Sequence, residues 1–169
     1  MEHISYQTVP KDEIFIKKDR SNHQEYFLLE GVCRSFLYNP EGEDITISFF
    51  QGPTVISPFT VRTNGTQSIF HFQASTDLLL GRIDAFAFLN LMIQNLEIRE
   101  FGNTVLRNEL MQKVDKEIGL ASLTARERLL KFRKQYDMLE NLIPHTQIAS
   151  YLGITTISLS RLRGELAKE

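Results

Sequence analysis

IPHTQIASYLGITTISLSRL, residues 143–162, is the stretch that decides how this chain folds. Ile148 and Leu152 lie four residues apart, so they share one face of a helix. Gly153 follows where a chain leaving a helix turns through positive φ, which glycine tolerates. The stretch therefore predicts two short helices that meet at a tight turn, with Pro144 at the opening of the first.

The second helix has a distinct apolar face. Either Thr155 or Thr156 can cap its start, and its apolar residues are Leu159, Leu162 and Leu166. Ala149 is small enough to let the two helices cross closely. This arrangement predicts a helix-turn-helix, whose second helix enters the major groove of DNA. An αα-hairpin used only for packing is the alternative.

The outward face of the second helix favours DNA binding over simple packing. It carries hydroxyl and guanidinium groups where a purely structural surface helix would more often carry Glu and Lys: Thr156, Ser158, Ser160, Arg161 and Arg163. Arginine can donate two hydrogen bonds to guanine, and hydroxyls reach bases or phosphates.

The composition indicates one medium or two small domains, because the chain has 169 residues and is 42% hydrophobic. No apolar run approaches the roughly 20 residues of a membrane span, and residues 1–5 lack the features of a signal peptide. The single cysteine, Cys33, excludes an intrachain disulfide and a cysteine-rich metal or iron–sulfur site. We expect a cytoplasmic protein with no membrane contact, no metal and no cofactor.

Charge is distributed unevenly along the chain. Residues 119–169 hold 8 Lys and Arg against 5 Asp and Glu, a net charge of +3, and residues 1–118 hold 11 against 16, a net charge of −5. The two parts sum to the overall −2. A mildly basic end on an acidic body is consistent with a modest DNA-binding module.

The first half of the chain has the pattern of short β-strands. Turn-forming clusters at 39–42 and 51–53 separate them. The expected strands lie at 14–16, 26–29, 32–38, 45–49, 69–73 and 78–80. Short strands at close spacing predict a small antiparallel barrel or sandwich.

Helical patterns follow. Asp84 can cap a helix over 85–94, and Thr124 can open a capping box before a helix over 128–138. Between them, a helix over 97–120 is apolar on more than one face. One face can pack on the barrel and the other on the same helix of a second subunit. The expected homodimer contacts are Ile98, Phe101, Val105 and Met111. A helix buried within one subunit is the alternative.

This order of elements resembles the Crp–Fnr superfamily of bacterial transcription regulators. YFLLEG at 26–31, NPEGED at 39–44 and FFQG at 49–52 are similar to the barrel signature of that family. IASYLGIT at 148–155, with Ser160-Arg161 and Ala125-x-x-Arg128, is similar to its DNA-binding half. The resemblance implies an α+β fold. A cyclic-nucleotide-binding-like jelly-roll barrel would occupy 1–95, a dimerisation helix 96–120 and a helix-turn-helix domain 121–169.

The resemblance also implies a homodimer that binds a palindromic site in double-stranded DNA and recruits or blocks RNA polymerase. A small-molecule effector of unknown identity is a further implied partner. The expected DNA-binding residues are His145, Thr146, Thr155, Thr156, Ile157, Ser158, Ser160, Arg161 and Arg163. Ile157 stands where many members have a charged residue, and it can meet a thymine methyl group instead.

The sequence departs from the family at the cyclic-nucleotide site. Members that bind cyclic AMP carry Gly-Glu and then Arg-Ser or Arg-Thr, where this chain has Ile56-Ser57 and Gln67-Ser68. Loss of the arginine removes the strongest contact to the phosphate. We therefore predict that cyclic AMP is not the ligand and that any effector pocket involves Ser57, Arg62, Gln67 and Ser68. Arg62 can serve another anion or simply lie on an exposed loop.

Two other classes of function are alternatives to a DNA-binding regulator. No β-wing is evident after Leu166, which predicts weaker DNA affinity. Together with the altered cyclic-nucleotide site, the missing wing leaves open a second function: a ligand-binding or protein-interaction module whose helix-turn-helix no longer binds DNA. A cupin-type enzyme needs two closely spaced histidines and a carboxylate, but His23 and His71 are the only barrel candidates. We predict no enzymatic activity, and we expect His71 to be a barrel residue and not a haem ligand.

Overall fold

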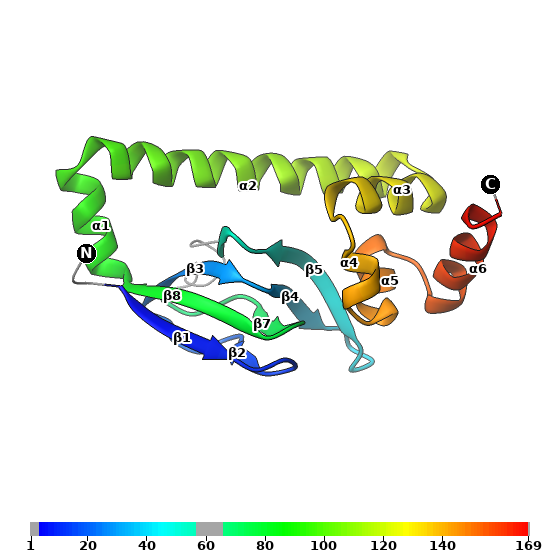
Figure 1. The fold of residues 1–169 in the computed structure, drawn as a ribbon, viewed down its shortest axis with the longest axis horizontal. Helices are drawn as coiled ribbons and strands as arrows, with labels where there is room; N and C mark the ends of the chain where they lie inside the picture. The colour runs from blue at the N-terminus through cyan, green and yellow to red at the C-terminus, as the bar shows by residue number, and fades with distance from the viewer. Residues whose placement is uncertain (1–3, 57–65, 169) are drawn as a thin grey trace.

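The computed structural model describes residues 4–56 and 66–168, and its β-strands form two antiparallel sheets (Figure 1). The strands are β1 (Ser5–Val9), β2 (Ile14–Ile16), β3 (Gln24–Glu30), β4 (Val32–Tyr38), β5 (Asp44–Gln51), β6 (Thr54–Ile56), β7 (His71–Ala74) and β8 (Leu78–Asp84). One sheet has the order β1-β8-β3-β6 and the other β2-β7-β4-β5. The predicted small antiparallel β-domain is confirmed.

The two sheets enclose a core in which side chains alternate inward along each strand. The first sheet contributes Leu28 and Leu80, and the second contributes Cys33 and Phe72, all fully buried. Strands β1 and β6 were not expected from the sequence. The first strand expected from the sequence lies at 14–16, but β1 precedes it; β1 escapes the sequence pattern because most of it is exposed and lacks an apolar alternation.

Helices make up the rest of the chain: α1 (Ala85–Gln94), α2 (Leu96–Ser122), α3 (Ala125–Gln135), α4 (Leu139–Leu142), α5 (His145–Leu152) and α6 (Thr156–Leu166). The side chain of Asp84 caps α1, and Thr124 forms the expected capping box at the start of α3. Helix α3 ends three residues earlier than predicted, because Tyr136 leaves the helical conformation (φ −124°, ψ 80°) and Met138 then takes a left-handed one with φ 64° before α4 begins. None of the helices in residues 4–56 and 66–168 has the length and apolar character needed to span a membrane.

The long helix α2 runs along one side of the molecule from the barrel to the helical domain (Figure 1). Its first end meets α1 beside the barrel, and its last end leads into α3. Helices α4, α5 and α6 lie beyond strand β5, at the opposite end of the molecule from α1.

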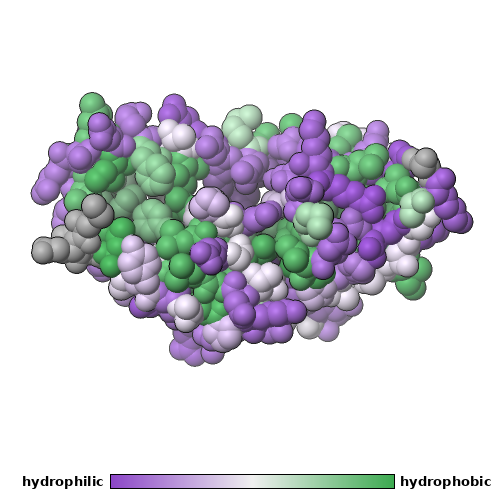
Figure 2. All heavy atoms as spheres, in the orientation of Figure 1, coloured by the Kyte–Doolittle hydropathy of each residue, from purple (hydrophilic) through white to green (hydrophobic). Residues whose placement is uncertain are grey.

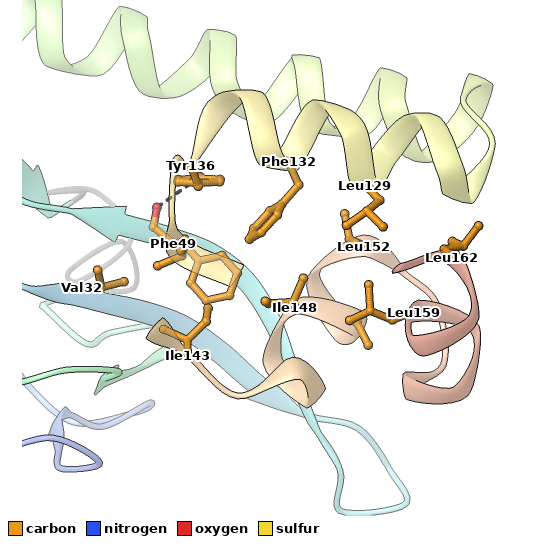
Figure 3. Close-up of a cluster of buried hydrophobic side chains, with 12 residues drawn as sticks. Val32, Phe49, Leu129, Phe132, Tyr136, Ile143, Ile148, Leu152, Leu159 and Leu162 are labelled. Carbon is orange, nitrogen blue, oxygen red and sulfur yellow. Dashed lines mark hydrogen bonds between the residues drawn. The ribbon is translucent and has the colours of Figure 1, made fainter. Parts of the chain in front are cut away.

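The barrel and the helical domain share one hydrophobic core (Figure 3). Phe49 of β5 is 3% exposed and points into the helical domain. Its ring lies 6.0 Å from that of Phe132, 6.0 Å from that of Tyr136 and 5.2 Å from that of Tyr151, measured between centroids. Aromatic pairs at these separations add specific attraction to the burial of apolar area. The two parts of the chain are therefore packed as one body.

The helices also cover the free edge of β5, the outermost strand of its sheet. Four hydrogen bonds join helical side chains to consecutive β5 residues: Ser150 Oγ accepts from Thr46 N (3.0 Å), Lys116 Nζ donates to Ile47 O (2.6 Å), Lys113 Nζ donates to Ser48 Oγ (2.8 Å) and Tyr136 Oη donates to Phe49 O (3.4 Å). An uncovered edge strand would be open to pairing with another chain. In this molecule the helices cover the free edge of β5.

We expect Phe49→Ala to lower the free energy of unfolding by about 3–5 kcal/mol, because it empties the centre of the shared core. Urea unfolding followed by circular dichroism measures the change. Tyr6→Ala is the control, because Tyr6 is an aromatic strand residue that is 69% exposed. A loss below about 1 kcal/mol for Phe49→Ala would contradict the packing described above.

Candidate nucleic-acid interface

The α5-turn-α6 unit is built as its sequence predicts. Gly153 takes φ 66° and ψ 38°, the left-handed conformation that ends α5. Thr155 is the N-cap of α6, where its Oγ1 accepts a hydrogen bond from Ser158 N at 3.1 Å. Pro144 occupies the N-cap of α5 instead of its first helical position, so α5 begins at His145.

Buried leucine and isoleucine side chains anchor α5 and α6 in the hydrophobic core of the helical domain. Ile148 and Leu159 are fully buried, and Ala149 is 2% exposed where the helices approach. Arg128 adds a polar tie, since its Nε donates to Leu152 O (2.9 Å) and its Nη1 to Leu123 O (2.7 Å). It thereby satisfies carbonyl groups at the C-terminal ends of α5 and α2, which lack partners within their own helices. Buried apolar side chains and the hydrogen bonds of Arg128 thus hold the helix-turn-helix unit on the rest of the helical domain.

Most of the predicted DNA-binding residues lie on the solvent side of this scaffold. The exposed ones are His145, Thr146, Thr155, Thr156, Ile157, Ser160 and Arg161. Ile157 is 83% exposed, and nothing within the described chain covers it. The side chain of Arg161 is 73% exposed, and its Nε lies a loose 3.8 Å from Glu165 Oε1. An exposed pair of this kind contributes little to stability, so the guanidinium is available to another partner.

Arg163 is placed differently from the other predicted contacts. Its Nε lies 2.5 Å from Glu140 Oε1, and its Nη1 lies 3.1 Å from His145 Nδ1. Glu140 also accepts two hydrogen bonds from Arg133, at 2.6 and 3.1 Å. We define these three residues, Arg133, Glu140 and Arg163, as the carboxylate clamp. It ties α6 to α3 and α4, so Arg163 holds α6 in place within the protein.

The charges of the clamp change the titration of its carboxylate. Burial acts to raise the pKa of Glu140, but the hydrogen bonds and positive charges of Arg133 and Arg163 outweigh it, and the pKa lies below its usual 4.5. No pattern in the sequence marks Glu140. Its partners lie seven and twenty-three residues away along the chain.

No family model matches this sequence, and no curated protein matches it. Solved structures do match. FixK2 from Bradyrhizobium japonicum has a TM-score of 0.84 at 18% identity, over 98% of this chain and 85% of its own. A CooA variant from Carboxydothermus hydrogenoformans has a TM-score of 0.79 at 20% identity, over 99% and 78%. A protein named as a Crp/Fnr family transcriptional regulator, from Eubacterium rectale, has 0.76 at 17%, over 95% and 77%.

The chain has the fold of the Crp–Fnr regulators. The match covers both the barrel and the helical domain, so the order of elements predicted from the sequence is confirmed. At these levels of identity the likeness establishes the fold.

Within this Crp–Fnr fold, only part of the predicted effector pocket can be placed. Ser57 and Arg62 lie outside the described residues. Gln67 forms an isolated β-bridge with Ser21. Ser68 is fully buried, and its Oγ donates to Phe70 O at 2.7 Å. The Ser68 hydroxyl is therefore engaged by the protein itself, and the effector assignment stays a prediction.

The predicted dimer contacts fall on two sides of α2. Ile98, Phe101 and Val105 line hollows between α2, α1 and the sheet β1-β8-β3-β6. Met111 faces solvent, within a stripe of exposed apolar residues that we call the α2 stripe: Leu110, Met111, Val114 and Ile118. Their spacing of three and four residues places them along one side of the helix. The stripe lacks a partner within the described chain.

Two other predictions concern histidine and metal. His71 stacks on Phe36 with ring centroids 5.1 Å apart, and its Nδ1 accepts from Lys18 N at 3.2 Å. It is thus held as a barrel residue. Residues 4–56 and 66–168 contain no cluster of three or more His, Cys, Asp or Glu side chains that could hold a metal ion.

We expect Glu140→Gln to destabilise the helical domain at neutral pH and to flatten its acid response. Loss of a buried pair costs about 3–5 kcal/mol, and because both arginines are about one-third exposed, about 1–3 kcal/mol is expected here. The lowered pKa means that the carboxylate stabilises the fold above pH 4.5 and that this contribution is lost as pH falls below it.

Urea unfolding at pH 7 and at pH 4 measures both effects. Glu41→Gln, in an exposed turn, is the matched control. If Glu140→Gln had the same stability as the wild type at pH 7, the clamp would not hold α6.

Proposed function

We propose that this chain is a transcription regulator that binds DNA sequence-specifically as a homodimer. One observation carries the proposal: a completely built helix-turn-helix presents an exposed face of hydroxyl, guanidinium and methyl groups on α6. The fold of the Crp–Fnr regulators over the whole described chain supports it. The net charge of +3 over residues 119–169 favours approach to DNA.

Base reading would fall to the exposed residues of α6. Arg161 has the reach and the free donors to bind a guanine edge bidentately, and Ser160 beside it can contact a base or a phosphate. Ile157 would meet a thymine methyl group, since an exposed isoleucine on a recognition helix has no hydrogen bond to offer. His145 and Thr146, at the N-terminus of α5, lie where a helix favours a phosphate.

Dimerisation would use the α2 stripe. An exposed apolar stripe along a helix of 27 residues is suited to pairing with the same helix of a second subunit. Two-fold symmetry would then place two copies of α6 about one helical turn of DNA apart, on a palindromic operator. RNA polymerase would be the partner at the promoter. A small molecule other than cyclic AMP would be the effector.

The experiment that tests the function is selection of bound sequences from a random duplex library with the purified full chain. A palindrome with half-sites about 10–11 base pairs apart is expected. Failure to enrich any sequence, together with DNA binding that does not change with salt, would overturn the proposal. That outcome would favour the alternative of a ligand-binding or protein-interaction module with a helix-turn-helix that no longer binds DNA.

We expect Arg161→Ala to reduce discrimination between the selected site and a mismatched site by about 1–3 kcal/mol per half-site, because it removes a bidentate base contact. Fluorescence anisotropy titrations with both duplexes measure the difference. Lys134→Ala, which removes one exposed positive charge from α3, is the control and should weaken both duplexes alike. Unchanged discrimination in Arg161→Ala would show that α6 is not the recognition helix.

We expect Ile118→Glu to convert the dimer into a monomer, because it places a charge within the apolar contact that the α2 stripe would make with its partner. Sedimentation velocity at micromolar concentration distinguishes the two states. Leu142→Glu makes the same kind of change at an exposed residue of α4 and should leave the dimer intact. A dimer that persists in Ile118→Glu would move the interface away from the α2 stripe.

A further inference from the structure

A cavity of about 160 Å³ lies where the barrel, α2 and the helical domain meet. In the space-filling view the molecule is hollowed between the middle of α2 and the sheets (Figure 2). The barrel contributes Ser48 to its wall, α2 contributes Lys113 and Lys116, and the helical domain contributes Tyr136 and Tyr151. The mechanism proposed for DNA binding uses none of these side chains.

Lys116 brings an ammonium group to the wall of this cavity. Its Nζ donates to Ile47 O at 2.6 Å and lies 4.0 Å from the centroid of the Tyr151 ring. Within the described residues, no carboxylate lies within ion-pair distance of this ammonium group. Burial and, to a lesser extent, the like charge of Lys113 together lower the pKa of Lys116 to about 8.

Lys113 brings a second ammonium group to the same cavity. Its Nζ donates to Ser48 Oγ at 2.8 Å and lies 3.7 Å from Glu109 Oε1. Burial lowers the pKa of Lys113, and Glu109 acts against that shift. The cavity thus holds two ammonium groups and one carboxylate. A net positive charge in a partly buried place is costly unless an anion offsets it.

We propose that this cavity binds a small oxyanion, inorganic phosphate or the phosphate group of a small metabolite, with Lys113 and Lys116 as its charge partners. The hydroxyl of Ser48 and the side-chain amides of Gln112 and Gln135, which also line the cavity, supply further hydrogen-bond donors. A set of several donors suits a phosphate group, which offers three strong acceptor oxygens where a carboxylate offers two. Lysine is a frequent phosphate partner in proteins.

The site joins the two parts of the chain, because its walls come from the barrel, from α2 and from the helical domain. A ligand that binds only the folded protein raises its stability in proportion to the logarithm of its concentration. Bound phosphate should therefore raise the unfolding temperature of the full chain. This expectation does not depend on DNA binding, so it can fail or succeed separately from the proposed function.

The test is a titration of the full chain with inorganic phosphate at pH 7.5, with sodium chloride exchanged to keep the ionic strength constant. Isothermal titration calorimetry and the unfolding temperature are both recorded. We expect saturable 1:1 binding to the wild type and at least tenfold weaker binding to Lys116→Gln. Lys134→Gln, which removes an exposed lysine from α3, is the matched control and should bind like the wild type.

Further arms identify the ligand class. Acetate should bind far more weakly than phosphate, and tighter binding of glycerol phosphate than of inorganic phosphate would assign the site to a phosphorylated metabolite. Circular dichroism verifies that Lys116→Gln is folded, and Lys113→Gln replaces it in the test if it is not. The proposal is overturned if the wild type shows no saturable phosphate binding, if acetate binds equally well, or if the folded lysine variant binds like the wild type.

Discussion

The structure depends on one contact, the insertion of Phe49 from the edge strand of the barrel into the aromatic side chains of the helical domain. Burial of this ring removes apolar area from both parts at once, and the hydrogen bonds along β5 satisfy the backbone groups that the strand edge would otherwise expose. The barrel and the helix-turn-helix are therefore placed relative to each other by a packed core and not by a linker.

The presentation of α6 follows from that core. Leu129 and Phe132 on α3 lie in the same cluster as Phe49 and as the buried leucines of α6 (Figure 3). The carboxylate clamp then holds α6 beside α3 and α4, because Glu140 forms ion pairs with both Arg133 and Arg163. The exposed face of α6 is thus held by apolar packing below it and by ion pairs beside it. The cavity with Lys113 and Lys116 opens at the same junction, where an anion would contact the elements that carry this arrangement.

Much of the fold was predictable because it rests on local rules. The glycine turn at Gly153 and the capping box at Thr124 depend on a few neighbouring residues, and each appears where the sequence places it. The cap of α6 depends on local residues too, and the structure selects Thr155 from the two candidates, Thr155 and Thr156. Strands β1 and β6 were missed because β1 is largely exposed and β6 has three residues, so neither shows an alternating pattern. Arg163 was predicted as a DNA contact, yet its partner Glu140 is twenty-three residues away and cannot be found from spacing.

The sequence by itself determined the succession of elements, the helix-turn-helix and the polar outward face of α6, because periodicity, caps and turns act over a few residues. Only the tertiary structure decided which side of α2 faces the barrel, which arginine is free and which is clamped, and that two lysines of α2 share a cavity with β5. Those features depend on contacts between residues far apart in the chain. Their burial and charge exist only after the barrel and the helices have packed together.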